Sequence, residues 1–163
     1  MPEEQKKEPV FTDRYVKPHR KVSRDVTEKD LKRVAEEAHV MYNLCFCRWG
    51  MYPSAFAIAH PQIDDKDPLR FFVTAQREII INPAIINHTK VPVKSLEGCM
   101  SLPSTPRVVV NRFNKCEVEF TTLTKEGVLS ERLHKDIGGQ ESRIWQHEIQ
   151  HLDSIYIYDD TKI

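Results

Sequence analysis

Glycine is scarce in this chain, which has 163 residues and only five glycines. No G-x-G-x-x-G or G-K-[ST] sequence can be written with them, so the dinucleotide fingerprint and the phosphate-binding P-loop are both absent. No run of about 18 apolar residues occurs, which argues against a transmembrane helix. The first residues have no apolar core behind their charges, so no secretory signal or typical transit peptide is visible.

The chain also lacks a net charge of one sign, because 24 basic residues balance 24 acidic residues. A neutral surface argues against general nucleic-acid binding, which depends on displacing counterions from phosphates. It argues equally against binding to an anionic membrane surface. Hydrophobic residues make up 40% and charged residues 29%, as is typical of a soluble globular protein. The four cysteines, without a secretory signal, predict free thiols in a reducing compartment.

The pattern of the chain predicts an extended polar arm over residues 1–26 and a single domain over 27–163. Apolar residues at helical spacing predict a helix over 28–44, and a second helix is expected over 140–152. Short apolar or alternating runs predict strands at 56–60, 71–74, 77–81, 107–111, 116–122 and 128–133, with a final strand at 154–160. We therefore expect an α+β domain with antiparallel strands around a central C-terminal helix.

The sharpest chemical signal is the sequence H-E-I-Q-H at 147–151. Histidines four positions apart lie one turn apart on the same face of a helix, so His147 and His151 can share one metal ion. Glu148 lies beside the first histidine and can act as general base toward a metal-bound water. The motif thus predicts a metal-dependent hydrolase.

The third metal ligand is expected upstream, because no glutamate follows the motif and the metzincin spacing is not met. Cys99 stands out because the neighbouring Gly98 lets the backbone approach a metal or a substrate closely. A thiolate is also a good ligand for zinc or ferrous iron. The other candidates that remain open are His60, His88, Cys116 and His134.

Two motifs resemble those of the peptide deformylase family. The sequence E-G-C-M-S-L-P at 97–103 resembles the family's E-G-C-L-S motif, and Q-H-E-I-Q-H-L at 146–152 resembles its H-E-x-x-H helix. The sequence I-N-P at 81–83 and the segment that follows the second motif resemble further stretches of that family. The resemblance runs from about residue 28 to residue 160 and implies the peptide deformylase fold.

The resemblance also implies a role for each matching residue. Glu148 would take a proton from water and pass it to the leaving amine. The side-chain amide of Gln62 and the backbone N–H of Met100 would stabilise the oxyanion. The reaction would remove the N-formyl group from the formyl-methionine that begins a nascent peptide. One divalent ion, Fe²⁺ or Zn²⁺, with water in its fourth position, would be held by Cys99, His147 and His151.

The family's first motif, G-x-G-x-A-A-x-Q, is altered in this chain, which reads A-F-A-I-A-H-P-Q at 55–62. The Cβ atom of Ala57 is expected to protrude where the backbone approaches the substrate. Three roles are open to the imidazole of His60: it fills part of the pocket, it supplies a hydrogen bond, or it is a buried histidine with satisfied hydrogen bonds. We favour the last interpretation. We therefore place Ala57, His60 and Gly98 at the substrate pocket and expect activity that is reduced or redirected.

These features predict a peptide deformylase that takes part in N-terminal methionine processing during protein biosynthesis. The alternative is a deformylase-like protein that keeps the metal, has lost the reaction, and recognises peptide N-termini or ribosomes. A different metallopeptidase remains open if the third ligand is not Cys99. Gln150 replaces the family's usual aspartate and removes a charge near the metal. The expected partners are formyl-methionyl peptides, and the ribosome is a further candidate. The expected location is a bacterial or phage-like cytoplasm, a mitochondrion or a plastid.

Overall fold

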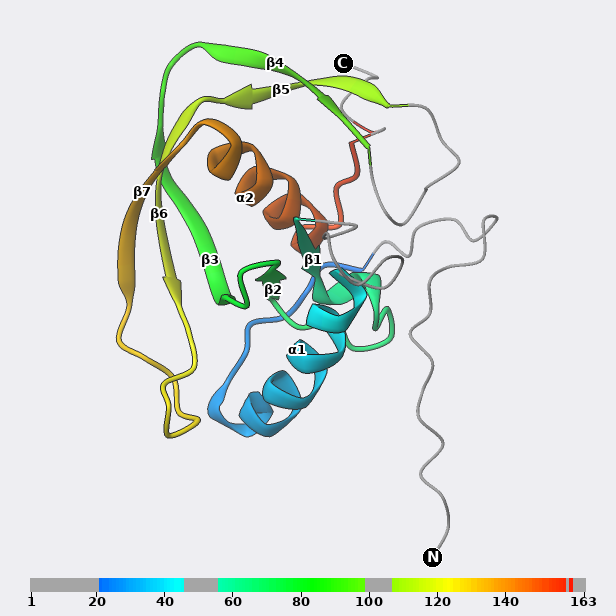
Figure 1. The fold of residues 1–163 in the computed structure, drawn as a ribbon, viewed down its shortest axis with the longest axis vertical. Helices are drawn as coiled ribbons and strands as arrows, with labels where there is room; N and C mark the ends of the chain where they lie inside the picture. Colours follow the sequence, from blue (N-terminus) through cyan, green and yellow to red (C-terminus); the bar gives the residue numbers. More distant parts are fainter. Residues whose placement is uncertain (1–20, 46–55, 99–106, 158, 160–163) are drawn as a thin grey trace, which may run out of the picture.

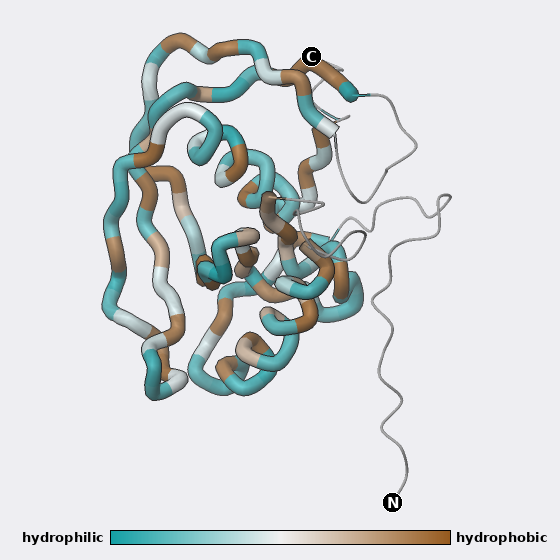
Figure 2. Tube along the Cα trace, in the orientation of Figure 1, coloured by the Kyte–Doolittle hydropathy of each residue, from teal (hydrophilic) through white to brown (hydrophobic). Residues whose placement is uncertain are grey.

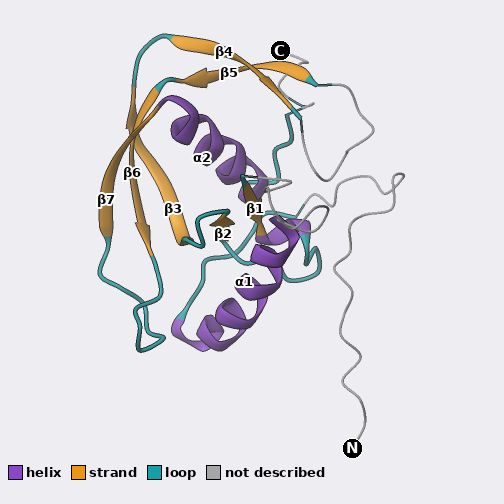
Figure 3. Cartoon of the chain, in the orientation of Figure 1, coloured by secondary structure: helices purple, strands orange, loops and turns teal. Residues whose placement is uncertain are grey.

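A computed structural model of the chain describes residues 21–45, 56–98, 107–157 and 159. It contains two α-helices, two short 3₁₀ helices and seven strands, counted over these residues (Figures 1 and 3). In chain order the elements are η1 (Glu28–Asp30), α1 (Leu31–Cys45), β1 (Ala57–Ala59), η2 (His60–Gln62), β2 (Phe71–Thr74), β3 (Ile79–His88), β4 (Pro92–Glu97), β5 (Val108–Phe113), β6 (Lys115–Thr121), β7 (Leu133–Gly138) and α2 (Gly139–Leu152).

Five of the strands form one antiparallel sheet in the order β1-β2-β3-β6-β7, and β4 pairs with β5 in a separate hairpin. Figure 1 shows helix α2 lying between this hairpin and the larger sheet. The helix contacts β1, η2, β5, β6 and β7. The expected arrangement, antiparallel strands around a C-terminal helix, is thereby confirmed, and α2 is placed at the centre of the fold.

The sheet separates two hydrophobic cores because successive side chains of a strand point to opposite faces. On β2, Phe71 and Val73 pack in the core that contains α1, whereas Phe72 packs against α2. Figure 2 shows hydrophobic positions gathered where the helices meet the strands. Burial on both faces explains why β2 is a continuous apolar run in the sequence.

Helix α1 follows a well-capped 3₁₀ turn. The carboxylate of Asp30 accepts hydrogen bonds from the backbone N–H of Thr27 at 2.8 Å and from its hydroxyl at 3.0 Å. Arg24 donates to both oxygens of the same carboxylate, at 3.0 and 2.9 Å. The helix expected over 28–44 is confirmed, with Val34, Ala38 and Met41 fully buried.

Residues 21–26 lie against the body of the domain. The N–H of Ser23 donates to the carbonyl of Leu152 at 2.9 Å, and Arg24 forms a parallel bridge with Leu69. The earlier part of the expected arm, residues 1–20, lies outside the described residues. The division into an arm and one domain stays a prediction.

Strand β3 does not stop at Asn82-Pro83, contrary to the expectation from the sequence. It continues to His88 through a bulge, where the pairing with β6 shifts between Ile81 and Ala84. Asn82 has a φ of 48°, and its side chain bonds both the N–H and the carbonyl of Val26, at 2.8 and 3.0 Å. Proline, which lacks an N–H, is tolerated here because the ladder is already interrupted.

Two other strand expectations require correction, and one observed strand was not expected. The partner of β6 is β7, at 133–138 instead of 128–133, because residues 122–132 form a longer connection with one bridge, between Leu123 and Leu129. The segment 154–160 contains no strand in its described residues, 154–157 and 159. Strand β4 was not expected, because most of its residues are exposed. Among the described residues, no helix has the length and hydrophobicity required to cross a bilayer.

Candidate active site

Helix α2 presents the two motif histidines to one point. It begins directly after β7 at Gly139, whose φ of 59° favours glycine. The Nε2 atoms of His147 and His151 lie 3.1 Å apart. Two imidazole nitrogens bound at about 2.0–2.1 Å to one tetrahedral ion would lie about 3.3 Å apart, so the observed spacing fits a shared metal.

Gln146, the residue before the motif, fixes α2 against strand β5. Its Oε1 accepts from the N–H of Phe113 at 2.9 Å, and its Nε2 donates to the carbonyl of the same residue at 2.8 Å. The side chain thus replaces a backbone partner at the end of the strand. This contact sets the position of the helix, and therefore of both histidines, relative to the β4–β5 hairpin.

A buried ion pair orients His147. Glu97, at the end of β4, accepts from His147 Nδ1 at 2.9 Å and from Arg112 Nε and Nη2 at 2.8 and 2.7 Å. Arg112 is 1% exposed. Because an ionised carboxylate only accepts, His147 carries its proton on Nδ1 and presents a lone pair on Nε2. This is the arrangement in which a carboxylate holds a metal-ligating histidine.

Sequence reasoning missed the pair of Glu97 and Arg112. The signal that could have revealed it is the alternation of strand β5, in which Val108, Val110 and Arg112 share one face. An arginine at an inward-facing strand position requires a partner of opposite charge.

Glu148 is buried beside the histidines, with 5% of its surface exposed. Its Oε2 atom has no hydrogen-bond partner among the described residues. Burial and the charge of Glu97 raise its pKa to about 7, against the opposing charges of His147 and Arg112. Burial also lowers the pKa of His151 well below its ordinary value, which keeps that imidazole neutral. A neutral histidine can serve as a metal ligand, and a buried carboxylate with an open oxygen beside it can accept a proton.

Gln62 ends the 3₁₀ helix η2, which contacts α2. Its Oε1 accepts from the N–H of Ala59 at 2.8 Å. The carbonyl oxygen of the amide is therefore hydrogen-bonded to β1. The amide nitrogen is the atom that can donate a hydrogen bond, as an oxyanion donor requires.

The predicted pocket residues fall in different surroundings. Ala57 is buried on β1, opposite Thr74. Gly98 is exposed just after β4, and a Cβ atom there would lie 3.5 Å from Arg107 Cγ, an ordinary contact. His60 is fully buried with both ring nitrogens hydrogen-bonded, which agrees with the interpretation we favoured. The predicted third ligand Cys99 and oxyanion donor Met100 lie outside the described residues.

The other candidate ligands have structural partners. His134 is exposed and pairs with Glu119 at 3.3 Å. His88 is exposed and stacks on Phe113. Cys116 is a buried thiol that accepts from Ser142 Oγ at 3.3 Å, as expected for a core cysteine.

A second group of donors, Glu37, His60 and Asp64, lies close enough to hold an ion, with ligand atoms within 4.8 Å of one another. His60 Nδ1 accepts the N–H of Leu69 at 2.8 Å, so a neutral ring carries its proton on Nε2, the nitrogen that faces Glu37. Arg33 binds both carboxylates of the group. We interpret it as a hydrogen-bonded ion-pair network.

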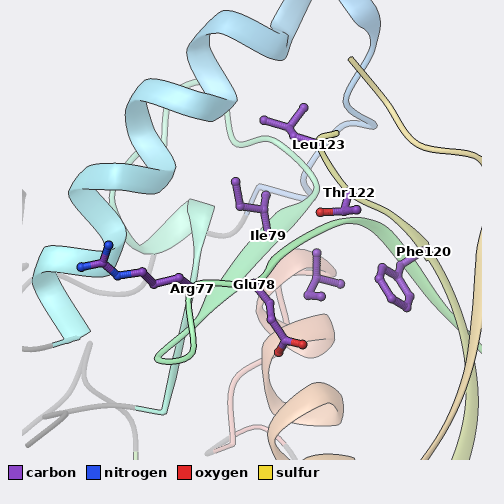
Figure 4. Close-up of a pocket in the computed structure, with 7 residues that line it drawn as sticks. Arg77, Glu78, Ile79, Phe120, Thr122 and Leu123 are labelled. Atoms are coloured by element: carbon purple, nitrogen blue, oxygen red, sulfur yellow. The ribbon is translucent and has the colours of Figure 1, made fainter. Parts of the chain in front are cut away.

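A pocket of about 270 Å³ lies beside strands β3 and β6 (Figure 4). The pocket is lined by residues 77–80, before and within β3, and by Phe120, Thr122 and Leu123, at or just beyond the end of β6. None of the predicted site residues that the structure describes lines it. The pocket is therefore separate from the histidine site on α2.

Comparison with known proteins gives one consistent result. The family model described as polypeptide deformylase matches residues 13–162. Peptide deformylase 2 of Nostoc sp. is 33% identical over 115 residues, which cover 63% of this chain and 60% of that protein. The peptide deformylase of Thermus thermophilus is 30% identical over 99 residues, 61% of this chain and 48% of the relative. The matched segments thus span about half to three fifths of these two relatives.

Solved structures agree with this result. The crystal structure of the peptide deformylase from Thermotoga maritima has a TM-score of 0.71 and 25% identity, and the match covers 86% of this chain and 88% of that one. A Plasmodium falciparum peptide deformylase in complex with an inhibitor has a TM-score of 0.70 and 27% identity, with coverage of 90% and 85%.

Proposed function

Because the chain belongs to the polypeptide deformylase family, we propose that it hydrolyses the N-formyl group of formyl-methionyl peptides. Water and the formamide would give formate and a free N-terminal amine. The observation that carries the proposal is the convergence of His147 and His151 Nε2, 3.1 Å apart, beside the buried carboxylate of Glu148.

We propose that His147 and His151, with Cys99, hold one divalent ion, Fe²⁺ or Zn²⁺. Such an ion would supply Lewis acidity and acidify water in the site. The donor set fits, since a thiolate and two neutral imidazoles suit both metals. Glu97 supports the set by holding the proton of His147 on Nδ1.

The remaining groups would act on protons and on the oxyanion. Glu148 would accept the proton of the attacking water on its open Oε2 atom and donate it to the leaving amine. A buried carboxyl with a pKa raised to about 7 is suited to both steps near neutral pH. The Gln62 amide, oriented by Ala59, and the Met100 N–H would stabilise the developing oxyanion. Ala57 and Gly98 would border the substrate, and His60, which is fully buried, would support the pocket from behind.

Formate release from formyl-Met-Ala-Ser tests the proposal, with protein purified anaerobically and loaded with ferrous iron. Glu148→Gln should lower kcat by about 10²–10⁴-fold, because it removes the general base. Glu141→Gln is the matched control on the same helix, since Glu141 pairs only with the partly exposed Lys135 among the contacts described.

Release by wild type and the control, but not by Glu148→Gln, would support a deformylase. Absence of release from wild type that carries one metal ion per chain would refute the proposed activity. It would favour the alternative, a protein that binds peptide N-termini or ribosomes without catalysis. The proposed deformylase activity would belong in a compartment where proteins begin with formyl-methionine.

A further inference from the structure

His60 is a fully buried residue that ties together three parts of the fold. Its Nδ1 accepts the N–H of Leu69 at 2.8 Å, and its Nε2 contacts the carboxylate of Glu37 on α1. Its ring stacks on Phe71, with centroids 4.7 Å apart. An alanine side chain, which the related motif has at this position, could make neither hydrogen bond.

Glu37 is itself held in place. Arg33 pairs with it at 3.2 Å and also binds Asp64 at 2.8 Å and Asp67 at 2.7 Å. Burial acts to raise the pKa of Glu37, but the hydrogen bond from His60 and the charge and hydrogen bond of Arg33 outweigh it, so the pKa lies below its ordinary value. Helix α1 thus holds η2 at its first residue and just beyond its last.

The segment that needs this support is short. Helix η2 spans only His60–Gln62, and the carbonyl of His60 accepts from the N–H groups of Ile63 and Asp64 at 2.9 and 3.0 Å. A single 3₁₀ turn has little stability of its own. The Gln62 side chain is held at its Oε1 by the N–H of Ala59, and its direction also depends on what anchors the turn that carries it.

We propose that His60 and Glu37 form a latch that fixes η2 and thereby the side-chain amide of Gln62. This inference rests on the proposed function, because it takes Gln62 as the oxyanion donor. Both are positioning residues, since neither needs to touch the substrate. The latch attaches the part of the site carried by η2 to helix α1.

Three variants separate the two hydrogen bonds of His60. Glu37→Ala removes the latch partner and leaves His60 unchanged. His60→Gln places an amide nitrogen near the former Nε2 and can still donate to Glu37, whereas His60→Asn places an oxygen near Nδ1 and can only keep the bond to Leu69. Glu36→Ala is the matched control, because its partner on the same helix, Lys32, is exposed and 3.9 Å away.

Glu37→Ala and His60→Asn should lower kcat by about 10–100-fold with KM changed less than threefold, since a displaced oxyanion donor mainly affects the transition state. His60→Gln should retain more of kcat than His60→Asn, and Glu36→Ala should match wild type. A rise in kcat/KM for the His60 variants would instead show that the imidazole only narrows the pocket, and would overturn the latch.

A double-mutant cycle shows whether the latch acts through Gln62. In a Gln62→Ala background, Glu37→Ala should cause less than a twofold further loss of kcat, because the amide that it positions is gone. The proposal would be overturned if the loss of kcat in the double variant equalled the product of the two single losses, because Glu37 would then act independently of the amide.

A readout that does not need catalysis keeps this inference separate from the proposed activity. The side-chain NH₂ resonances of Gln62, identified by their loss in Gln62→Ala, should shift or broaden in Glu37→Ala and stay unchanged in Glu36→Ala. Unchanged Gln62 resonances in a folded Glu37→Ala protein would refute the latch even if the enzyme is active. If wild type releases no formate while these resonances respond as expected, the activity fails and the latch stands.

Discussion

Replacing Glu97 with glutamine should both destabilise the fold and disturb His147, a proposed metal ligand. The Glu97 side chain is 11% exposed, and the guanidinium of Arg112 beside it is almost fully buried. Glutamine would leave this guanidinium charge in the interior without a counter-charge, which is strongly unfavourable. It would also replace an acceptor for His147 Nδ1 with a weaker, neutral one.

The structure gives the magnitude of this loss. Burial acts to raise the pKa of Glu97, but hydrogen bonds from Arg112 and His147 outweigh it and lower the pKa from 4.5 to about 2. At about 1.4 kcal/mol per pKa unit, the shift corresponds to about 3 kcal/mol. Removing one partner of a buried ion pair costs roughly 3–5 kcal/mol, which agrees. We expect Glu97→Gln to lower the free energy of unfolding by about 3 kcal/mol at pH 7.

The same contribution predicts a pH dependence. Because the pKa of Glu97 is lower in the folded state, the unfolded chain binds more protons between about pH 2 and 4.5, and stability rises with pH across that window. The wild type should therefore lose this contribution as pH falls from about 4.5 to about 2, and Glu97→Gln should not. Urea unfolding of metal-free protein at a series of pH values measures the difference.

A second substitution separates the two roles of the carboxylate. Adding Arg112→Met to Glu97→Gln removes both charges and should restore stability to within about 1 kcal/mol of wild type. Metal affinity should remain about 10–100-fold lower, because His147 still lacks its carboxylate. Glu119→Gln, which breaks exposed pairs, should cost less than about 1 kcal/mol. A similarly small cost for Glu97→Gln, or full recovery of metal affinity in the double variant, would refute this reasoning.

Three further predictions concern the fold and the metal. Asn82→Ala should lower the free energy of unfolding by about 2–3 kcal/mol, measured with urea, because it removes both bonds to Val26 and leaves a left-handed backbone without asparagine. Asp30→Asn should cost about 1 kcal/mol in the same assay by weakening the cap and the pair with Arg24, and an unchanged midpoint would contradict this. A chelator should abolish formate release and lower the thermal midpoint by several degrees, and ferrous iron should restore both.

The two helices and the histidine motif could be predicted from the sequence because their signals are local. Helix periodicity gave the ends of α1 and α2 to within three residues, and the i, i+4 spacing alone placed His147 and His151 on one face. The break at Asn82-Pro83 was misread, because local rules see only a turn residue and a missing N–H. The bulge persists because tertiary partners hold it: the N–H of Asn82 donates to the carbonyl of Arg70, and the side-chain amide of Asn82 binds the backbone of Val26.

The network that supports the site was beyond sequence reasoning for a different reason. Glu97 and Arg112 are 15 residues apart and meet only because the register of β4 and β5 puts both on the face toward α2. His60 was recognised as a departure, but its partner Glu37 lies 23 residues away on α1. Such pairs depend on how elements pack, which the spacing of residues along one element does not specify.

The altered positions therefore affect the two halves of the site unequally. Gln150, in place of an aspartate, accepts from Arg112 Nη1 at 2.8 Å and so keeps a hydrogen bond while adding no charge. A carboxylate there would share Arg112 with Glu97 and weaken the contacts that hold Glu97 against His147. The histidine half thus keeps its geometry through a neutral substitute. The other half, β1 and η2, contains a larger change, since a histidine replaces an alanine and brings α1 into contact with the turn that carries Gln62. Among the described residues, a difference in the proposed activity from other members of the family should therefore originate in the η2 half of the site.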